Sequence, residues 1–529
     1  MMKKRVLVAD SIAPAGIEIL QMNASVDVRL GLTPSELQSA IGEYEALIVR
    51  SQTKVTREII DAGAKLEVIA RAGVGVDNID VDAATRRGIF VINSPEGNTV
   101  STAEHTVAML LALARQIPKG NSDLRAGIWN RSLRGIELRN KVLGIIGLGR
   151  VGSAVAEIAR GFRMNVIAFD PMVSQTAADR LGVQVAEMGT LLARSDFVSV
   201  HVPLNLATKG LIGAKELRQM KPTAMIINCA RGGIIDEQAL YEALEEGRLA
   251  GAAVDVFSQE PAVGNILVKS NRVVVTPHLA ASTAEAETSA GVDVAEQTIA
   301  VLGGHLPRTP VNAPAVPADG VTMIDQYLRT ARTMGVIAGQ MLEGQSNSIA
   351  IRYQGDISKQ NTEPLKAAVL GGLLESLTDE RVNIVNMNSV ASSRGLRISE
   401  ERNDVCENYS NMLTVEIDGT SGRVVVAGSS LRGSVYLLRV NDFWLEIEPS
   451  GGYMLFTEHK DRPGMIGAVG TIMGEAGINI SQMQVNRGLQ RGGKAMMVLC
   501  VDDPVTTDLH NRLLAMPDMY KVHVVKLTR

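Results

Sequence analysis

Short runs of aliphatic and β-branched residues alternate with amphipathic stretches over the first 300 residues. The runs have the length of buried strands, and the stretches between them have helical periodicity, including long predicted helices at 99–116 and 284–302. Such alternation predicts parallel sheets with helices on both faces. The pattern restarts at residue 141, which predicts a second sheet. The predicted strands are 5–9, 46–50, 66–70 and 89–92, then 141–146, 164–169, 197–202, 224–228, 250–256 and 273–276.

The pattern changes after this region. Four prolines between Pro307 and Pro317 predict a semi-rigid linker. The block 315–450 has a predicted helix at 323–342 and strand-like runs but no recognisable motif. Residues 453–529 have the order strand, helix, strand, strand, helix, strand, which is the ferredoxin-like pattern.

Composition and charge narrow the class of protein. A length of 529 residues, with 46% apolar and 21% charged, predicts a globular chain of three or four domains. The net charge of −4 is interspersed without a basic stripe, so we expect no nucleic-acid partner. No apolar run approaches the roughly 18 residues of a membrane span, and no signal peptide is expected. Three scattered cysteines have neither disulfide nor metal-ligand spacing, so we expect a cytoplasmic protein without a metal site.

A glycine-rich turn follows the first strand of the second predicted sheet. Gly147, Gly149 and Gly152 form G-x-G-x-x-G between a strand and a helix, and Asp170 ends the next strand 18 residues after Gly152. These glycines would allow a tight turn, approach of a pyrophosphate and close helix packing, respectively. The helix N-terminus attracts phosphates. Asp170 can accept hydrogen bonds from ribose hydroxyls and would repel a 2′-phosphate, which favours NAD over NADP.

Three other strand ends of this sheet carry chemically suited side chains. Arg231, Glu260 and His278 follow the predicted strands 224–228, 250–256 and 273–276. In doubly wound sheets, ligands bind at these carboxyl ends. A guanidinium can grip a substrate carboxylate, an imidazole can take a hydroxyl proton as hydride leaves, and a carboxylate can orient the imidazole. Taken singly, each could instead be a surface, turn or strand-capping residue.

These residues, together with four longer segments, resemble the D-isomer-specific 2-hydroxyacid dehydrogenases. The segments are 50–55, 71–80, 93–99 and 228–233. The resemblance implies an α/β chain in which a discontinuous, flavodoxin-like substrate domain (1–95 and 285–311) surrounds a Rossmann-type NAD-binding domain (96–284). It also implies that Arg231 binds substrate, that Glu260 supports the histidine and that His278 is the catalytic acid/base.

Further ligand contacts are implied by the same resemblance. Cofactor contacts are expected at Val74, Gly147, Gly149, Arg150, Val151, Gly152, Asp170, Val202, Cys229, Ala230, Arg231, Asp255, His278, Leu279, Ala280 and Ala281. At Val202, related enzymes carry different small residues, so a backbone contact is expected there. Substrate contacts are expected at Arg50, Ser51, Arg71, Gly73, Asn98 and Arg131. The arginines would supply charge for a phosphorylated substrate, and in related enzymes the region around Arg131 helps form a dimer interface.

The activity that the resemblance implies is oxidation of D-3-phosphoglycerate to 3-phosphohydroxypyruvate with NAD, the first step of phosphorylated L-serine biosynthesis. Another D-2-hydroxyacid dehydrogenase, acting on glycerate, glyoxylate or 2-oxoglutarate, is an alternative. A nucleotide-sensing binding protein with the same fold is a third interpretation.

The C-terminal segment has a resemblance of its own. Residues 453–467 resemble the opening of an ACT domain, in which a D-R-P-G turn leads from a strand into a helix. Such domains pair side by side and bind amino acids between them. This implies that 453–529 is a regulatory ACT domain with L-serine contacts at His459, Asp461 and Asn479, or else a pairing module without a ligand. The block 315–450 corresponds to an α+β intervening domain, and we expect a homo-oligomer, either a dimer or a tetramer.

Overall fold

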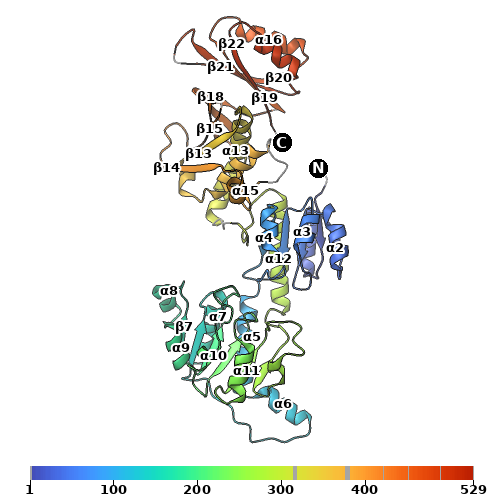
Figure 1. Cartoon of the computed structure of the whole chain (residues 1–529), viewed down its shortest axis with the longest axis vertical. Helices are drawn as coiled ribbons and strands as arrows, with labels where there is room; N and C mark the ends of the chain where they lie inside the picture. The colour runs from blue at the N-terminus through green and yellow to red at the C-terminus, as the bar shows by residue number, and fades with distance from the viewer. Residues whose placement is uncertain are drawn as a thin grey trace.

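The computed structural model of the chain contains four sheets that follow one another along a long axis (Figure 1). It describes residues 3–313, 318–375, 382–420, 422–450, 452–488 and 490–527, without the side chains of 318–322. Two parallel sheets, one mixed sheet and one antiparallel sheet confirm the predicted fold class. Within the described ranges, no helix combines the length and apolar character that a bilayer span requires.

The N-terminal sheet is parallel, with the flavodoxin-like strand order β2-β1-β3-β4-β5. Its central strands are aliphatic and almost wholly buried, as expected when helices cover both faces of a parallel sheet. The strands are β1 (Arg5–Val8), β2 (Ser25–Val28), β3 (Ala46–Val49), β4 (Val68–Arg71) and β5 (Phe90–Asn93). The helices are α1 (Pro14–Asn23), α2 (Pro34–Ala40), α3 (Arg57–Ala62) and α4 (Val81–Arg86), with a 3-10 turn η1 (Ile41–Glu43).

A late helix, α12 (Ala284–Leu302), returns to this sheet and packs on α1, β4 and β5. Gly16 allows this close approach, because a Cβ there would lie 2.6 Å from the carbonyl oxygen of Gly291. The late return explains how residues far apart in sequence complete one N-terminal unit.

The segment after α12 pairs with the first sheet, although its prolines predict a semi-rigid linker from Pro307. The backbone N–H of Val311 donates to the carbonyl oxygen of Val91 at 2.8 Å, and the side chain of Asn312 accepts from the N–H of Val91 at 2.9 Å. The prediction of a linker beginning at Pro307 is therefore wrong, because this segment satisfies the open edge of β5. Residues 314–317, the rest of the predicted linker, lie outside the described residues.

The second sheet is parallel, with strand order β12-β11-β10-β9-β6-β7-β8. The order reverses between β6 and β9, which opens a crevice at the carboxyl ends of the strands. The edge strand β8 was not predicted, because two residues are too few to show an alternating pattern. The strands are β6 (Val142–Ile146), β7 (Asn165–Phe169), β8 (Gln184–Val185), β9 (Phe197–Val200), β10 (Met225–Asn228), β11 (Gly251–Val254) and β12 (Val273–Val275). The helices are α5 (Thr99–Ala114), α6 (Ile117–Arg125), α7 (Arg150–Gly161), α8 (Gln175–Arg180), α9 (Met188–Arg194), α10 (Ala214–Leu217) and α11 (Glu237–Glu245), with a 3-10 turn η2 (Ile266–Lys269).

The third sheet has the order β14-β13-β15-β16-β17-β18 and is mixed, because only β13 and β14 pair in parallel. The helix α13 (Ala318–Met341) begins earlier than the predicted residue 323 and packs closely on α14 (Glu363–Leu374). Gly335 makes this possible, because a Cβ there would lie 2.1 Å from the carbonyl oxygen of Val369. The remaining elements are β13 (Ser346–Gly355), η3 (Asp356–Lys359), α15 (Met387–Ser393), β14 (Arg397–Asn403), β15 (Asn411–Gly419), β16 (Gly422–Leu431), β17 (Ser434–Val440) and β18 (Phe443–Ile447).

The C-terminal sheet has the predicted ferredoxin-like order, β20-β21-β19-β22, with antiparallel pairing throughout. It contacts the third sheet at two places: β22 lies against α13, and β20 lies beside β18. The Gln340 side chain bonds to both the N–H and the carbonyl oxygen of Lys526, each at 2.9 Å. The elements are β19 (Tyr453–Lys460), α16 (Met465–Glu475), β20 (Ile480–Arg487), β21 (Lys494–Val501), α17 (Thr507–Leu514) and β22 (Met519–Lys526).

Candidate active site

The glycine turn lies at the switch point of the seven-stranded sheet, between β6 and α7. Gly147 has a φ of 95°, and a Cβ there would lie 2.6 Å from the carbonyl oxygen of His201. A Cβ on Gly152 would lie 2.1 Å from the carbonyl oxygen of Gly147, so only glycine lets α7 pack this closely. A Cβ on Gly149 would meet nothing within 4 Å. Open space in front of the α7 N-terminus fits the pyrophosphate of a dinucleotide.

Asp170 follows β7 and is held at the mouth of this turn. Its Oδ2 accepts from the N–H of Leu148 at 2.8 Å, and its Oδ1 accepts from the N–H of Met172 at 2.9 Å. Each oxygen keeps a second lone pair that a ribose hydroxyl can use. Arg150, at the start of α7, lies 3.3 Å from the carboxylate of Glu96. This ion pair joins the glycine turn to the segment after β5.

The predicted acid/base pair forms between the loops that follow β11 and β12. Nδ1 of His278 lies 2.9 Å from Oε2 of Glu260, whose Oε1 accepts from the N–H of Phe257 at 3.1 Å. Because Glu260 engages Nδ1, Nε2 is the ring atom left to exchange a proton with a substrate. His278 has a φ of 57°, a left-handed conformation that is uncommon for residues other than glycine.

Arg231 lies in the loop after β10, beside the loop that carries Glu260. The two loops touch, because a Cβ on Gly232 would lie 2.0 Å from the carbonyl carbon of Phe257. Nε of Arg231 is 3.3 Å from Oδ2 of Asp77, in the loop after β4 of the other sheet. Arg231 therefore connects the two parallel sheets from a loop that touches the one carrying Glu260.

Three arginine side chains approach one another here: Arg50 after β3, Arg71 at the end of β4, and Arg231. Nε of Arg71 is buried without a hydrogen-bond partner among the described residues. Burial, followed by the charges of Arg231 and Arg50, lowers the pKa of Arg71 to about 10. Gly73 leaves room for this guanidinium, because a Cβ there would lie 2.2 Å from Nη1 of Arg71. The cluster is suited to an anion with several oxygens.

Polar contacts hold the loops that carry these arginines in place. The carboxylate of Asp10 accepts from the N–H of Arg50 at 2.6 Å. The amide of Asn78 donates to the carbonyl oxygens of Arg50 and Thr53 at 2.7 and 2.6 Å. Arg50 itself pairs with Glu287 of α12 at 2.9 Å. The loops after β3 and β4 are thereby joined to each other and to α12.

The remaining predicted substrate residues do not all lie here. Ser51 adjoins Arg50, and Asn98 immediately precedes α5 at the crossover between the parallel sheets. Arg131 lies in the segment after α6, which Figure 1 shows at the end of the molecule away from the N-terminal sheet. Within one chain the structure does not bring Arg131 to the arginine cluster.

Of the other predicted cofactor residues, Val151 lies in the first turn of α7, and the rest occupy loops at the carboxyl ends of both parallel sheets. The thiol of Cys229 is buried, and burial together with the charge of Asp255 raises its pKa to about 12. Ala280 is also buried, whereas Leu279 is exposed. These other predicted cofactor residues are Val74, Val151, Val202, Cys229, Ala230, Asp255, Leu279, Ala280 and Ala281.

Sequence reasoning missed two residues of this site. His105 of α5 lies 3.3 Å from the carboxylate of Asp255, and Asp77 pairs with Arg231. His105 lies in a helix pattern without a motif. Asp77 lies within the segment 71–80 but was given no role, because its partner Arg231 is far away in sequence. Across the residues that the structure describes, no group of three His, Cys, Asp or Glu side chains could hold a metal ion.

The predicted effector residues occupy opposite ends of the C-terminal sheet. His459 pairs with Ala495 in the β19–β21 register, whereas Asn479 precedes Ile480, which pairs with Val501. The two ends are offset by six positions along β21, roughly 20 Å. His459 is only 2% exposed, and burial lowers its pKa.

Asp461 lies at the His459 end, where its carboxylate accepts from the N–H of Gly492 at 3.2 Å. Asn479 donates instead to Asp502 at 2.7 Å. One C-terminal domain therefore does not bring the three effector residues together.

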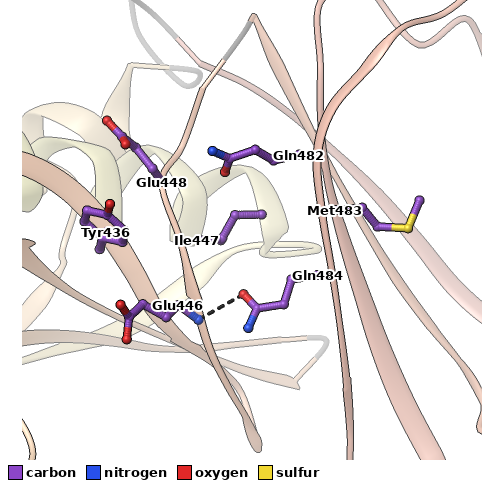
Figure 2. Close-up of a pocket in the computed structure, with 7 residues that line it drawn as sticks. All are labelled: Tyr436, Glu446, Ile447, Glu448, Gln482, Met483 and Gln484. Carbon is purple, nitrogen blue, oxygen red and sulfur yellow. Dashed lines mark hydrogen bonds between the residues drawn. The ribbon is translucent and has the colours of Figure 1, made fainter.

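A separate cavity of about 420 Å³ lies where β20 adjoins β17 and β18 (Figure 2). Gln482 and Gln484 point from β20 toward β18, and Oε1 of Gln484 accepts from the N–H of Glu446 at 3.0 Å. Its lining includes none of the predicted catalytic, cofactor, substrate or effector residues: Tyr436, Glu446, Ile447, Glu448, Gln482, Met483 and Gln484.

One family description and several solved structures match the part of the chain that contains the glycine turn and the acid/base pair. The D-isomer specific 2-hydroxyacid dehydrogenase, NAD binding domain, matches residues 107–280. A glyoxylate reductase from Paecilomyes thermophila is 31% identical with a TM-score of 0.55, covering 59% of this chain and 99% of that one. The apo-structure of D-lactate dehydrogenase from Escherichia coli is 28% identical with a TM-score of 0.52, covering 58% and 99%. The fold and site thus define a D-isomer-specific 2-hydroxyacid dehydrogenase with an NAD-binding domain.

Matches to the remaining domains and to full-length relatives narrow the family. The D-3-phosphoglycerate dehydrogenase intervening domain matches residues 323–438, and the ACT domain matches 453–517. D-3-phosphoglycerate dehydrogenase of Synechocystis sp. is 44% identical over 526 residues, covering 99% of this chain and 95% of that one. The enzyme of the same name from Archaeoglobus fulgidus is 41% identical over 527 residues, covering 99% and 100%. The chain belongs to the D-3-phosphoglycerate dehydrogenase family.

Proposed function

We propose that the protein oxidises D-3-phosphoglycerate to 3-phosphohydroxypyruvate, the first step of phosphorylated L-serine biosynthesis. NAD, when bound, supplies the nicotinamide ring that accepts the hydride from C2 of the substrate. Nε2 of His278 takes the proton of the 2-hydroxyl, while Glu260 holds the ring through Nδ1. The guanidinium of Arg231 binds the substrate carboxylate and fixes which face of C2 is presented.

The observation that carries the substrate assignment is the arginine cluster. A simple 2-hydroxy acid has one carboxylate, which Arg231 can bind. D-3-phosphoglycerate also has a phosphate group with a charge of about −1.5 to −2 at pH 7. Arg71 offers a buried Nε without a partner among the described residues, and Arg50 lies close enough to lower its pKa. A bound phosphate would satisfy this donor and relieve the repulsion among the three cations.

The test compares substrates that differ only in the phosphate. In Arg71→Gln, we expect kcat/KM for D-3-phosphoglycerate to fall about 10- to 100-fold, because one charge-assisted contact is lost. The much lower kcat/KM for D-glycerate should change less than threefold. The matched control is Arg57→Gln, since Arg57 is an exposed arginine of α3 that pairs with Asp61. Equal losses on both substrates in Arg71→Gln would contradict the phosphate assignment.

Cofactor preference follows from the turn at Asp170. The carboxylate is fixed by two backbone N–H groups, so it cannot move away from a 2′-phosphate without breaking both hydrogen bonds. A negative charge at this position disfavours NADP and leaves acceptors for the ribose hydroxyls of NAD. In this proposal, the turn around the pyrophosphate is formed by Gly147, Gly149 and Gly152.

The expected domain division and location are part of this proposal. We assign 1–95 with 285–311 to the substrate domain, 96–284 to the cofactor domain, 315–450 to the intervening domain and 453–529 to the ACT domain. The contacts of α12 with α1, β4 and β5 support the discontinuous first domain. Free cysteines, two of them buried, support a reducing compartment such as the cytoplasm.

Feedback by L-serine, within this proposal, requires two copies of the chain. His459 and Asp461 lie at one end of the C-terminal sheet and Asn479 at the other. Two such domains placed side by side in opposite directions would bring the His459 end of one next to the Asn479 end of its partner. A homo-oligomer therefore supports serine binding, and a second subunit also offers Arg131 a route to a cleft.

A further inference from the structure

Asp255 is a fully buried carboxylate that directly follows β11, and several of its contacts are to the loop that carries His278. Its Oδ1 accepts from the N–H of Leu279 at 2.8 Å, and its Oδ2 accepts from the N–H of Ala280 at 3.0 Å. Its carbonyl oxygen accepts from the N–H of His278 at 2.9 Å. Three successive N–H groups of one turn thus point at a single residue.

This convergence accounts for the backbone of His278. Successive N–H groups that face one anion form a concave arrangement, which requires a left-handed residue in the turn. His278 is that residue, with a φ of 57°. The buried anion therefore stabilises the conformation that directs the imidazole toward Glu260. Without it, a residue with a side chain would favour the right-handed or extended regions.

The Asp255 carboxylate is held from its other side by two groups. The hydroxyl of Thr276 donates to Oδ1 at 2.6 Å, and Nε2 of His105 lies 3.3 Å from the same oxygen. Nε2 of His105 also lies 3.3 Å from the Thr276 hydroxyl. Among the described residues, His105 is the side chain of α5 that contacts this carboxylate.

We propose that His105 is a positioning residue for the acid/base pair: with Thr276 it fixes the Asp255 carboxylate, and Asp255 fixes the turn that holds His278 against Glu260. This inference rests on the proposed function, because it assigns His105 to the same site. The side chain of His105 contacts Asp255 and Thr276, and it acts on His278 through Asp255.

The ionisable groups around this turn determine what a pH profile of the reaction would measure. The titratable groups that contact the turn or its buried carboxylate include Glu260, Asp255 and His105, with Cys229 beside Asp255. Burial and Asp255 keep Cys229 protonated by raising its pKa to about 12. The acid limb of the pH profile therefore reports the pairing of His278 with Glu260 most directly.

The test uses full-length protein with substitutions at His105 and Thr276. His105→Ala should lower kcat about 10- to 100-fold, since a charge-assisted contact to Asp255 is lost, with KM for D-3-phosphoglycerate within about twofold. The acid limb of kcat/KM should move to lower pH, because an imidazolium that loses its carboxylate partner forms less readily. His105→Gln keeps a donor at the Nε2 position and should restore both values to within about threefold.

A second pair keeps the proposal testable if His105→Ala folds poorly. Thr276→Val should repeat the loss and the shift, and Thr276→Ser should behave like the unsubstituted protein. The matched control is Thr106→Val, which removes a buried α5 hydroxyl that donates to the carbonyl oxygen of Thr102 instead of to Asp255. An unshifted acid limb in both His105→Ala and Thr276→Val would overturn the proposal.

A measurement without substrate separates this inference from the proposed function. Carbethoxylation of His278 by diethyl pyrocarbonate at pH 6, followed by mass spectrometry, should be at least about threefold faster in His105→Ala, because Nδ1 is then released from Glu260 and open to the reagent. An unchanged rate would contradict the positioning role even if turnover is normal. If the unsubstituted protein does not oxidise D-3-phosphoglycerate but the rate at His278 rises, only the proposed function fails.

Discussion

Substituting the middle glycine of the turn separates cofactor binding from folding. Gly149 has φ −74° and ψ −160°, which alanine adopts freely, and a Cβ there would meet nothing within 4 Å. Gly149→Ala should therefore leave unfolding free energy unchanged or raise it by about 0.4–1 kcal/mol. The new methyl would occupy space that we assign to the pyrophosphate. Loss of one charge-assisted contact, about 1.5–3 kcal/mol, corresponds to NADH binding about 10- to 100-fold weaker.

Two neighbouring glycines provide matched controls for this experiment. A Cβ on Gly152 would lie 2.1 Å from the carbonyl oxygen of Gly147, so Gly152→Ala should cost about 1–3 kcal/mol through overpacking. Gly161, at the other end of α7, meets nothing within 4 Å, so Gly161→Ala should change neither property by much. Thermal unfolding followed by circular dichroism and NADH fluorescence titration measure the two effects. Unweakened NADH binding in Gly149→Ala would refute the placement of the dinucleotide.

The remaining predictions concern specificity, thiol reactivity and control. Asp170→Ala should weaken NAD binding and reduce discrimination against NADP at least tenfold, and unchanged preference in kcat/KM would remove Asp170 from the ribose site. The pKa of about 12 leaves roughly 10⁻⁴ of Cys229 as thiolate at pH 8, so iodoacetamide should modify it about a thousandfold more slowly than an unfolded cysteine, as mass spectrometry can check. L-Serine should lower the rate, and Asn479→Ala should relieve this effect; inhibition that persists would place the effector elsewhere.

Much of the fold could be predicted because its signals are local. The aliphatic runs of a parallel sheet are buried on both faces and are therefore visible in the sequence, as at 46–50 and 224–228. β8 was missed because it is two residues long at a sheet edge. The segment 309–312 was assigned to a linker because the edge of β5 that binds it is more than two hundred residues earlier in the chain.

The candidate site likewise contains residues that could be predicted from the sequence and residues that could not. Arg231, Glu260 and His278 could be selected because each directly follows a strand of one sheet, and strand ends converge. His105 could not, because its contact with Asp255 depends on how α5 packs across the sheet. The opposite placement of His459 and Asn479 was equally hidden, since it follows from strand pairing and not from their spacing along the chain.

NADH formation by the unsubstituted protein tests the central claim most directly. Protein mixed with NAD and D-3-phosphoglycerate, with the keto product trapped chemically, should give NADH and 3-phosphohydroxypyruvate in equal amounts, while His278→Ala gives neither but still binds NADH. Turnover of D-glycerate or D-lactate at a kcat/KM equal to or above that for D-3-phosphoglycerate, or undiminished turnover by His278→Ala, would contradict the account.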